Sequence, residues 1–381
     1  MDELYIIAGG GTAALAAARA VRAKDRKTGL RMLCGEGVLP YSRPFLTDTV
    51  KTGEKAALLV GPEWYEKNNI ETVFEKAAAI DPDRKTVFLG NGESVRYSKL
   101  LVATGANPFN PVKIVEGGIP VFTLRTEKDA EAIIEKCGRS KKAVVAGGGI
   151  LGVEAALALA ARGLEVTICE LADRLMKLTA DEALSAEMTD YLKKLRIDSV
   201  TGTSIAENTA AGAALTNGGF IEADFILVSA GIRSETAVAK AAGLAVNRGI
   251  VVDNHMAASA PDIYAAGDCA EYNGRVAGLA TAAAEQGSVA GAAMAGDISA
   301  VYAEKPTATY FNNKDFNFVS VGRVGLAYGE PVSPSKGARL YIENGEVIGA
   351  VLTGDAAKAK IVSAVQKKLP LDQIVSLIKS A

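Results

Sequence analysis

The chain of 381 residues has few of the residue types on which hydrolytic and metal chemistry most often depends. It contains one histidine, His255, and four cysteines, and no two of these cysteines form a C-x-x-C or C-x-x-x-x-C pair. Histidine-centred triads need histidine, and metal or dithiol redox sites need closely spaced thiolates. We therefore expect no metal site, no catalytic triad, a surface loop position for His255, and four reduced cysteines.

The chain also lacks a charge excess and a long apolar run. Its formal net charge is −2 and it has no long basic stripe, which argues against nucleic acid binding. The apolar N-terminal stretch follows two acids and is interrupted by three glycines and by Arg19. A signal peptide needs a basic start, and a membrane span needs about 18 uninterrupted apolar residues. We expect a cytoplasmic protein that does not span a membrane and has two or three domains.

Two glycine-rich segments in the chain resemble each other. "LYIIAGGGTAALAAARA" and "AVVAGGGILGVEAALALAARG" both consist of an apolar stretch, a glycine turn and an alanine-rich stretch. The first turn, starting at Gly9, matches G-x-G-x-x-A, and the second, starting at Gly147, matches G-x-G-x-x-G. In this pattern the first glycine forms a tight turn, the second lets the backbone approach a pyrophosphate, and the third position allows close packing of helix on strand. Each segment therefore predicts a strand, a dinucleotide-binding turn and a helix.

An acidic residue ends the next strand of each copy. Glu36 lies 27 residues after Gly9, and Glu170 lies 23 residues after Gly147. Both spacings are close to the ~20 residues expected for a carboxylate that binds ribose hydroxyls. Because both copies have the full strand, turn, helix, strand and acid, we predict two nucleotide-binding domains built on one duplicated α/β plan.

The two copies differ in length at one place. From Glu36 to Ile70 there are 34 residues, whereas the equivalent span from Glu170 to Ile197 has 27. After these points each copy has a hairpin turn, Asn91–Gly92 or Asn217–Gly219, and an apolar strand that leads to a glycine. The seven extra residues of the first copy fall in the region of the loop "LPYSRPFLTD".

With the segment "IYAAGDCAE" and the stretches "VATGANP" and "LRTEKDA", residues 1 to 300 resemble the flavoproteins with two dinucleotide-binding domains. The resemblance implies two Rossmann-like three-layer α/β domains and a small α+β C-terminal domain. The FAD-binding domain would comprise residues 1–108 and 237–305, the NAD-binding domain residues 109–236, and the C-terminal domain residues 306–381. The last region contains strand-like stretches around a turn at Asn344–Gly345, followed by two helix-like stretches.

The resemblance also implies which residues hold FAD. Asp268 would bind the ribityl chain, because a carboxylate accepts hydrogen bonds from hydroxyls. The N-terminus of the helix that follows would face the flavin pyrimidine edge, where a reduced flavin is anionic. The complete set of expected FAD-binding residues is Gly9, Gly10, Gly11, Thr12, Ala13, Ala14, Glu36, Arg43, Pro44, Ala77, Thr104, Gly105, Arg125, Asp268, Ala280 and Thr281.

In the second domain the resemblance implies an NADH site. Glu170 would bind both hydroxyls of the adenosine ribose and would repel the 2′-phosphate of NADPH, so we expect NADH to be preferred. Glu154 resembles a glutamate placed between nicotinamide and flavin in family members. The expected NAD-binding residues are Gly147, Gly149, Ile150, Leu151, Gly152, Glu154, Glu170 and Gly231.

The loop "LPYSRPFLTD" lies where disulfide reductases of the family have their cysteine pair, and no cysteine occurs from Gly35 through Lys136. It resembles the loop of the rubredoxin and ferredoxin reductases, which implies that Arg43 lies beside the isoalloxazine ring and that Pro44 fixes the chain there. Arg43 and Glu154 are the expected catalytic residues. The chain departs from ferredoxin reductases at Asp48, where a lysine often pairs with the equivalent of Glu154. Two facing acids would raise the pKa of one of them.

These features predict a cytoplasmic FAD-dependent NADH oxidoreductase without a redox-active disulfide. The expected acceptor is rubredoxin or a ferredoxin-like iron–sulfur protein, and the expected state is a monomer. An NADH oxidase that reduces O₂ and a ferredoxin reductase-like component remain alternatives, and so does a flavin-binding redox sensor without enzymatic turnover.

Overall fold

The computed structural model describes residues 3–354 and 358–379, and the chain divides by its internal contacts into two compact units. The predicted ends of the last two helices, at 356–357 and at 380, lie outside the described residues. The first unit comprises Met1–Leu46, Glu54–Phe109 and Gly231–Ala303, and the second comprises Thr47–Gly53, Asn110–Ala230 and Glu304–Ala381. The seven-residue segment from Thr47 therefore belongs to the second unit, although it follows the first glycine turn in the sequence.

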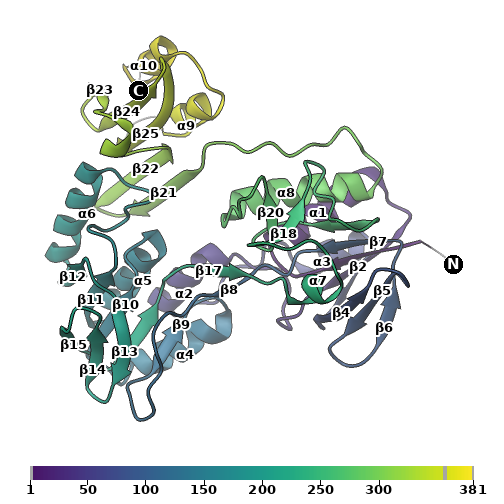
Figure 1. Cartoon of the computed structure of the whole chain (residues 1–381), viewed down its shortest axis with the longest axis horizontal. Coiled ribbons are helices and arrows are strands. Elements are labelled where there is room, and N and C mark those ends of the chain that lie inside the picture. The colour runs from purple at the N-terminus through teal and green to yellow at the C-terminus, as the bar shows by residue number, and fades with distance from the viewer. Residues whose placement is uncertain (1–2, 355–357, 380–381) are drawn as a thin grey trace. The chain divides into compact units, whose positions relative to one another are not determined.

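The first unit is built on a five-stranded parallel sheet (Figure 1). Its strands are almost wholly apolar, as expected for a parallel sheet buried on both faces, and Ile6, Ile7 and Leu100 are fully buried. In spatial order the strands are β19 (Ile263–Ala265), β7 (Lys99–Val102), β1 (Leu4–Ala8), β2 (Gly29–Leu33) and β3 (Ile70–Val73).

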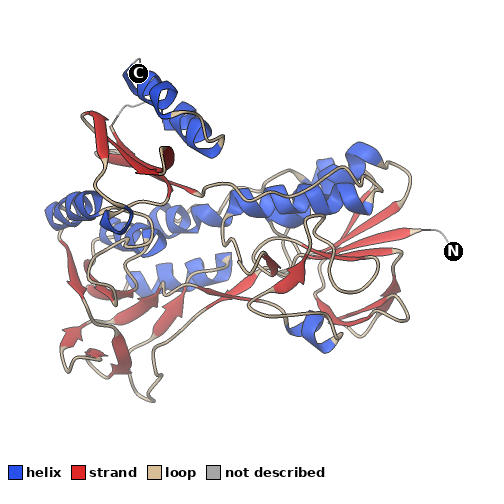
Figure 2. Cartoon of the chain, turned by 45° about the horizontal axis from the view of Figure 1, so that its top comes forward, coloured by secondary structure: helices blue, strands red, loops and turns tan. Residues whose placement is uncertain are grey.

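Two helices pack closely together in this unit, α1 (Thr12–Lys24) and α8 (Ala280–Met294) (Figures 1 and 2). Their contact depends on glycine. A Cβ atom at Gly287 would lie 2.2 Å from the carbonyl oxygen of Ala13, and one at Gly291 would lie 2.3 Å from that of Ala17. The alanine- and glycine-rich sequences of both helices are therefore explained by backbone packing that larger residues would prevent.

Smaller elements complete the first unit. The predicted hairpin at Asn91–Gly92 is confirmed, since it joins the last two strands of an antiparallel three-stranded sheet. The remaining elements are β4 (Ala77–Asp81), β5 (Thr86–Leu89), β6 (Ser94–Arg96), the pair β8 (Ala106–Pro108) and β17 (Ile232–Ser234), the pair β18 (Ile250–Val252) and β20 (Ala270–Tyr272), the 3₁₀ turn η1 (Arg43–Phe45), and the helices α3 (Pro62–Lys67) and α7 (Ala237–Ala241).

The second unit repeats the plan of the first, which confirms the predicted duplication. Its parallel sheet has the order β12 (Ile197–Thr201), β11 (Glu165–Glu170), β10 (Lys142–Ala146), β16 (Phe225–Val228) and β9 (Val121–Thr123). In each sheet the strand before the glycine turn is central, and the strand that leads to the acid lies beside it. A second three-stranded antiparallel sheet comprises β13 (Ile205–Thr209), β14 (Gly212–Leu215) and β15 (Phe220–Glu222).

The helices of this part of the second unit are α2 (Leu46–Thr52, of which Leu46 belongs to the first unit), α4 (Glu127–Cys137), α5 (Ile150–Ala161) and α6 (Glu182–Lys194). The amphipathic helices begin at predictable caps. Thr126 and Asp129 form a capping box at the start of α4, and the Asp181 side chain accepts a hydrogen bond from Leu184 N–H at the start of α6.

The C-terminal part of the second unit is a five-stranded antiparallel sheet with two helices (Figure 2). The hairpin at Asn344–Gly345 is confirmed, and it joins the two strands predicted around it. In spatial order the strands are β21 (Ala308–Asn313), β22 (Phe316–Gly322), β25 (Glu346–Thr353), β24 (Ala338–Glu343) and β23 (Val332–Ser335), followed in the chain by α9 (Lys358–Gln366) and α10 (Leu371–Lys379). Buried apolar residues from the sheet and both helices form one cluster.

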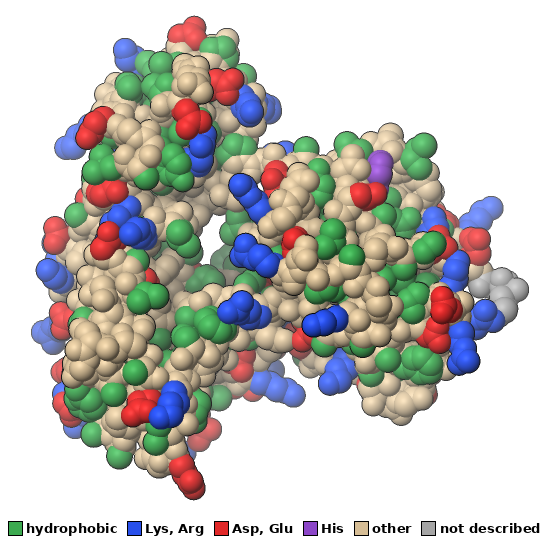
Figure 3. All heavy atoms as spheres, in the orientation of Figure 1, with side chains coloured by type: hydrophobic (Ala, Val, Ile, Leu, Met, Phe, Trp, Pro, Cys, Tyr) green, Lys and Arg blue, Asp and Glu red, His purple; other side chains and the backbone are tan. Residues whose placement is uncertain are grey.

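Charged side chains of both signs are mixed over the face shown in Figure 3. The single histidine, His255, is visible at that surface, where its Nδ1 lies 2.9 Å from the carbonyl oxygen of Ala300. This confirms its predicted surface position. Within the described residues, no helix is both long enough and apolar enough to cross a membrane.

Candidate cofactor-binding sites

The first glycine turn connects β1 to α1 and has the geometry of a phosphate cradle. Gly9 has φ +153°, and a Cβ there would lie 2.1 Å from the carbonyl oxygen of Ala103, so only glycine fits. A Cβ at Gly11 would instead meet no atom within 4 Å. The first glycine is therefore required by packing, whereas open space lies in front of the second, where a ligand could approach the backbone.

Helix α1 begins at Gly11 without a side-chain cap, and the same is true of α8 at Leu279 and of α5 at Gly149. The amphipathic helices α4 and α6 have side-chain caps. A helix N-terminus carries N–H groups without an intrahelical partner and favours negative charge. The uncapped start of α1 and the open space at Gly11 thus suit a pyrophosphate, and the assignment of this turn to FAD stays a prediction.

Glu36, the expected ribose acid, lies just beyond β2 and contacts Arg43 from the proline-containing loop. The Arg43 Nη2 atom donates to Glu36 Oε1, and the buried Tyr41 hydroxyl donates to Glu36 Oε2 at 2.8 Å. The guanidinium of Arg43 also lies over the Tyr41 ring, 5.1 Å from its centroid. The loop is therefore anchored at the acid of the first repeat.

The neighbours of Arg43 keep its guanidinium protonated. Burial alone would lower the pKa of Arg43, but the hydrogen bond and charge of Glu36 outweigh it, and the charges of Tyr41 and Asp268 add to the effect, so the pKa is raised. Arg43 thus lies within electrostatic reach of Glu36 and Asp268. The expected position of Arg43 beside the isoalloxazine ring of FAD stays a prediction.

Asp268 follows a glycine that packs against α1. Gly267 has φ +84°, and a Cβ there would lie 3.0 Å from that of Ala13. Its N–H donates to the buried side chain of Gln286 on α8 at 2.9 Å, and the Asp268 carbonyl accepts from Ser234 Oγ at 2.7 Å. The Asp268 segment is therefore fixed between the first turns of α1 and the body of α8.

Three further predicted residues lie near the ends of strands: Thr104 and Gly105 shortly after β7, and Ala77 at the start of β4. Thr104 Oγ1 donates to the carbonyl oxygen of Glu235 at 2.7 Å, and Gly105 accepts a hydrogen bond from the N–H of the same residue, which joins the two chain segments that cross there. Ala77 begins β4, and a Cβ at Gly35 would lie 2.9 Å from the Cβ of Lys76. Ala77 is thus brought close to the strand end that carries Glu36.

The structure brings most of the predicted FAD residues into the first unit. Arg125 is the exception, because it belongs to the second unit, where its N–H donates to Asp129 just before α4. Pro44 is the second residue of η1 and is exposed, and Ala280 and Thr281 are exposed at the uncapped start of α8. Their roles toward FAD stay predictions.

The second glycine turn, between β10 and α5, repeats the first. Gly147 has φ +115°, and a Cβ there would lie 2.3 Å from the carbonyl oxygen of Ser229, while one at Gly149 would meet nothing within 4 Å. A Cβ at Gly152 would lie 2.0 Å from the carbonyl oxygen of Gly147, so the third glycine permits the close packing that the motif predicts. Ile150 and Leu151 begin the first turn of α5, where Ile150 is half-buried and Leu151 is exposed.

Glu170 ends β11 and binds the glycine turn directly. Its Oε2 accepts from the N–H of Gly148 and its Oε1 accepts from the N–H of Ala172 at 2.7 Å. The carboxylate is therefore held at the turn that would receive the pyrophosphate. Gly231, the remaining predicted NAD-binding residue, belongs to the first unit and is not grouped with the other seven.

Glu154 lies in the second turn of α5 and has an unusual protonation equilibrium. Burial, and then the charge of Asp48, raise the pKa of Glu154 to about 7. Asp48 reaches it because α2 is tied to the same helix, through a hydrogen bond from Arg162 Nε to the carbonyl oxygen of Val50. The raised pKa that two facing acids predict is therefore found on Glu154.

The sequence analysis missed Tyr41 as a site residue. Its hydroxyl donates a hydrogen bond to Glu36, and its ring packs against the guanidinium of Arg43. The only signal was its place in the loop, two residues before Arg43. The sequence also gave no indication that Arg174, in the loop after β11, pairs with Asp173 and Glu182.

The two matched glycine turns, each on a parallel sheet and followed by a strand-end acid, define an oxidoreductase fold with two dinucleotide-binding regions. Residues 4–287 match the family model described as pyridine nucleotide-disulphide oxidoreductase. The chain belongs to this family, which implies FAD and a pyridine nucleotide as its cofactors. It is thus a flavin-dependent oxidoreductase, as the resemblance predicted.

Relatives and solved structures agree with this assignment. The chain is 30% identical over 380 residues to the NADH-rubredoxin oxidoreductase of Clostridium acetobutylicum, covering 98% of this chain and 97% of the relative. It is 36% identical over 277 residues to the rubredoxin-NAD(+) reductase of Pseudomonas putida, covering 70% and 71%. The crystal structure of a ferredoxin reductase from Rhodopseudomonas palustris matches with a TM-score of 0.90 and 25% identity, covering 100% of both chains.

Proposed function

We propose that this protein oxidises NADH through FAD and passes the electrons to rubredoxin or a similar small iron–sulfur protein. The observation that carries the proposal is the state of its thiols. All four cysteines are free and buried, and burial, with a smaller contribution from Glu36, raises the pKa of Cys34 to about 11. The thiolate is the reactive form of cysteine, so none of them is suited to relay electrons from a flavin.

FAD would be held by the first unit. The N–H groups at the start of α1 would bind its pyrophosphate, Glu36 its adenosine ribose, and Asp268 its ribityl chain. Arg43 would neutralise charge beside the ribose and pyrophosphate, because it pairs with Glu36 and feels the charge of Asp268. FAD, when bound, would accept two electrons from NADH as a hydride and release them one at a time to the acceptor.

NADH would bind to the second unit. The open Gly149 turn and the uncapped start of α5 suit the pyrophosphate, and Glu170 suits the adenosine ribose. Glu154 would hold a proton near neutral pH in the first turns of the same helix. The named relatives use rubredoxin, and a small iron–sulfur acceptor needs no thiol on the reductase. The domain bounds and the cytoplasmic location given by the sequence stay predictions.

A panel of acceptors tests this proposal. The purified FAD-loaded protein is supplied with NADH and, in parallel, with rubredoxin, a ferredoxin, glutathione disulfide or air-saturated buffer. We expect rubredoxin or ferredoxin to be reduced fastest at equal acceptor concentration. Fastest reduction of the disulfide would overturn the proposal, fastest consumption of O₂ would identify an oxidase, and no NADH oxidation with any acceptor would indicate a flavin-binding sensor.

A further inference from the structure

The loop after the ribose acid carries two cations beside the second glycine turn. Met176 N–H donates to the carbonyl oxygen of Gly148 at 2.8 Å, while Glu170 accepts from the N–H of the same glycine. The loop therefore lies directly on the turn that would receive a dinucleotide. Arg174 and Lys177 lie within two residues of Met176 in the sequence. Both cations are therefore near the position where a 2′-phosphate on the adenosine ribose would bind.

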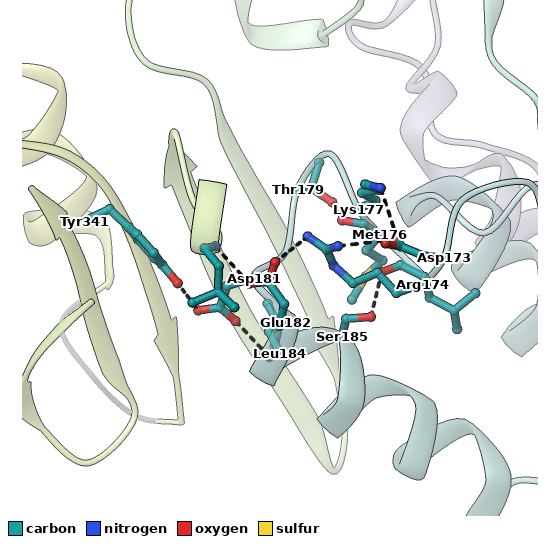
Figure 4. A network of polar contacts seen from close by, with 12 residues as sticks. Asp173, Arg174, Met176, Lys177, Thr179, Asp181, Glu182, Leu184, Ser185 and Tyr341 are labelled. Atoms are coloured by element: carbon teal, nitrogen blue, oxygen red, sulfur yellow. Dashed lines mark hydrogen bonds and ion pairs between the residues drawn. The ribbon is translucent and has the colours of Figure 1, made fainter. Parts of the chain in front are cut away.

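Both cations are already paired with carboxylates (Figure 4). Arg174 Nη2 lies 2.9 Å from Glu182 Oε1, and its Nη1 lies 3.4 Å from Asp173 Oδ1. Lys177 Nζ lies 3.1 Å from the same Asp173 oxygen. The hydrogen bond from Lys177 lowers the pKa of Asp173, so this carboxylate is ionised at neutral pH.

Glu182 is itself held on its other side. It is the first residue of α6, where the helix dipole favours a negative charge. Its Oε2 accepts a hydrogen bond from the N–H of Leu326, at 3.0 Å, in the 3₁₀ turn η2 (Leu326–Tyr328) of the C-terminal part. Arg174 is thus bound to an acid that a distant segment of the chain keeps in position, and its buried Nε–H has no hydrogen-bond partner among the described residues.

We propose that Asp173 and Glu182 are specificity-determining residues that withhold Arg174 and Lys177 from a 2′-phosphate and thereby make the second unit select NADH over NADPH. This inference rests on the proposed NADH site in that unit. A 2′-phosphate carries about two negative charges and needs unpaired cations beside the ribose acid. Here it would meet Glu170, Asp173 and Glu182, and both cations would have to leave their carboxylates to bind it.

The test compares the binding of NAD⁺ and NADP⁺ to the FAD-loaded full chain by isothermal titration calorimetry. The main variant is the double substitution Asp173→Asn and Glu182→Gln, which removes both charges while the amide oxygen introduced at position 182 can still accept from Leu326. We expect NADP⁺ to bind about tenfold more tightly than to the wild type, because each freed cation can form a charge-assisted hydrogen bond. NAD⁺ binding should change by less than about twofold, because NAD⁺ has no charge at that position.

The matched control is Glu187→Gln, another carboxylate of α6, which lies near Arg339 rather than Arg174. It should leave both affinities unchanged. Adding Arg174→Gln to the double variant should reverse the gain in NADP⁺ affinity. If NADP⁺ affinity stays at the wild-type level in the double variant while NAD⁺ still binds, or if the gain persists without Arg174, the inference is overturned. Should the wild type bind neither nucleotide, the proposed NADH site itself fails, which is a different result.

Should the double variant not fold, Glu182→Gln alone provides the second measurement. It keeps Asp173 and its contact with Lys177, and it removes the acid that holds Arg174 at 2.9 Å. We expect a smaller gain in NADP⁺ affinity in this variant, and the absence of any gain would contradict the role of Glu182.

Discussion

The hydroxyl of Tyr341 donates a hydrogen bond of 2.8 Å to the carboxylate of Asp181, which lies 160 residues earlier in the chain (Figure 4). The same buried carboxylate binds Arg339 through Nε at 2.6 Å and caps α6 through Leu184 N–H. An ionised side chain this deeply buried is stable only when its partners are complete. Asp181 therefore joins the strand β24 to the dinucleotide-binding part of the second unit.

Substitutions of the residues that bind the Asp181 carboxylate should destabilise the second unit selectively. Arg339→Leu leaves the charge of Asp181 buried without its guanidinium, and we expect a loss of about 3–5 kcal/mol in the free energy of unfolding. Tyr341→Phe removes one hydrogen bond at unchanged shape and should cost about 1–2 kcal/mol.

Urea unfolding followed by far-ultraviolet circular dichroism measures these losses. The chain has one tryptophan, Trp64, and it lies in the first unit, so its fluorescence follows that unit separately. An early transition in the dichroism with an unchanged fluorescence midpoint is the expected pattern. Equal stability of Arg339→Leu and wild type would show that Asp181 does not depend on this partner.

Gly9 and Gly11 of the first turn should respond differently to substitution by alanine. Gly9→Ala forces a Cβ to within 2.1 Å of the Ala103 carbonyl oxygen, and we expect it to cost about 3 kcal/mol or more. Gly11→Ala places its Cβ in open space at an extended position, so the stability of the apoprotein should change by less than about 1 kcal/mol.

The same Gly11→Ala variant should bind FAD at least about tenfold more weakly, because the added methyl group would occupy the proposed place of the pyrophosphate. Titration of apoprotein with FAD, followed by quenching of flavin fluorescence, measures this affinity. Normal FAD affinity in a well-folded Gly11→Ala protein would refute the placement of the pyrophosphate at this turn.

The sequence predicted the repeated plan because its signals are local. Glycine turns, strand-end acids and Asn-Gly hairpins lie within a few residues of the elements they shape, and both parallel sheets have the strand order that the repeat implies. The strands β21 and β23 were not predicted. Their sequences, "ATYFNN" and "VSPS", lack the apolar alternation of a strand, and they form the two edges of their sheet, where polar residues are tolerated.

Long-range pairings in the candidate sites could not be predicted in the same way. Nothing in the spacing of Asp181 and Arg339, 158 residues apart, indicates that they meet, because both fit equally well as exposed charges. Similarly, Arg125 and Gly231 were assigned by resemblance to one site each, but the structure groups each of them with the other unit. Which residues share a compact unit depends on how the whole chain folds, and local patterns do not contain that information.

Arg43 should contribute to FAD binding through its contacts with Glu36 and Tyr41. We expect Arg43→Ala to weaken FAD binding about tenfold or more, because the Glu36 carboxylate then loses its counter-charge beside the ribose and pyrophosphate. Arg43→Lys should be intermediate, since lysine keeps the charge without the planar fork.

Arg31→Ala is the matched control for Arg43→Ala. Arg31 lies on β2 in the same unit and pairs with Glu71 at 2.7 Å, away from Glu36. It should leave FAD affinity within about twofold of the wild type. If Arg43→Ala leaves both the FAD affinity and the rate of flavin reduction by NADH unchanged, the proline-containing loop has only a structural role.

Glu154 should make the second unit less stable as the pH rises from about 4.5 to about 7. Its pKa is raised in the folded chain from 4.5 to about 7, so below pH 4.5 the group is protonated in both states and its contribution is fully present. Between these values the unfolded chain ionises first, and the contribution is lost as the pH passes through 7. Its size is up to roughly 3 kcal/mol, from the shift in pKa.

Urea unfolding of wild type and Glu154→Gln at pH 5 and pH 7.5 measures this effect, and the variant should gain stability relative to wild type at the higher pH. Asp48→Asn should reduce the gain, because the charge of Asp48 is the second cause of the raised pKa. Glu135→Gln, at an exposed surface pair with Arg139, is the control and should show the wild-type slope. If Glu154→Gln and wild type lose the same stability between the two pH values, Glu154 does not carry a proton in the folded protein near neutral pH.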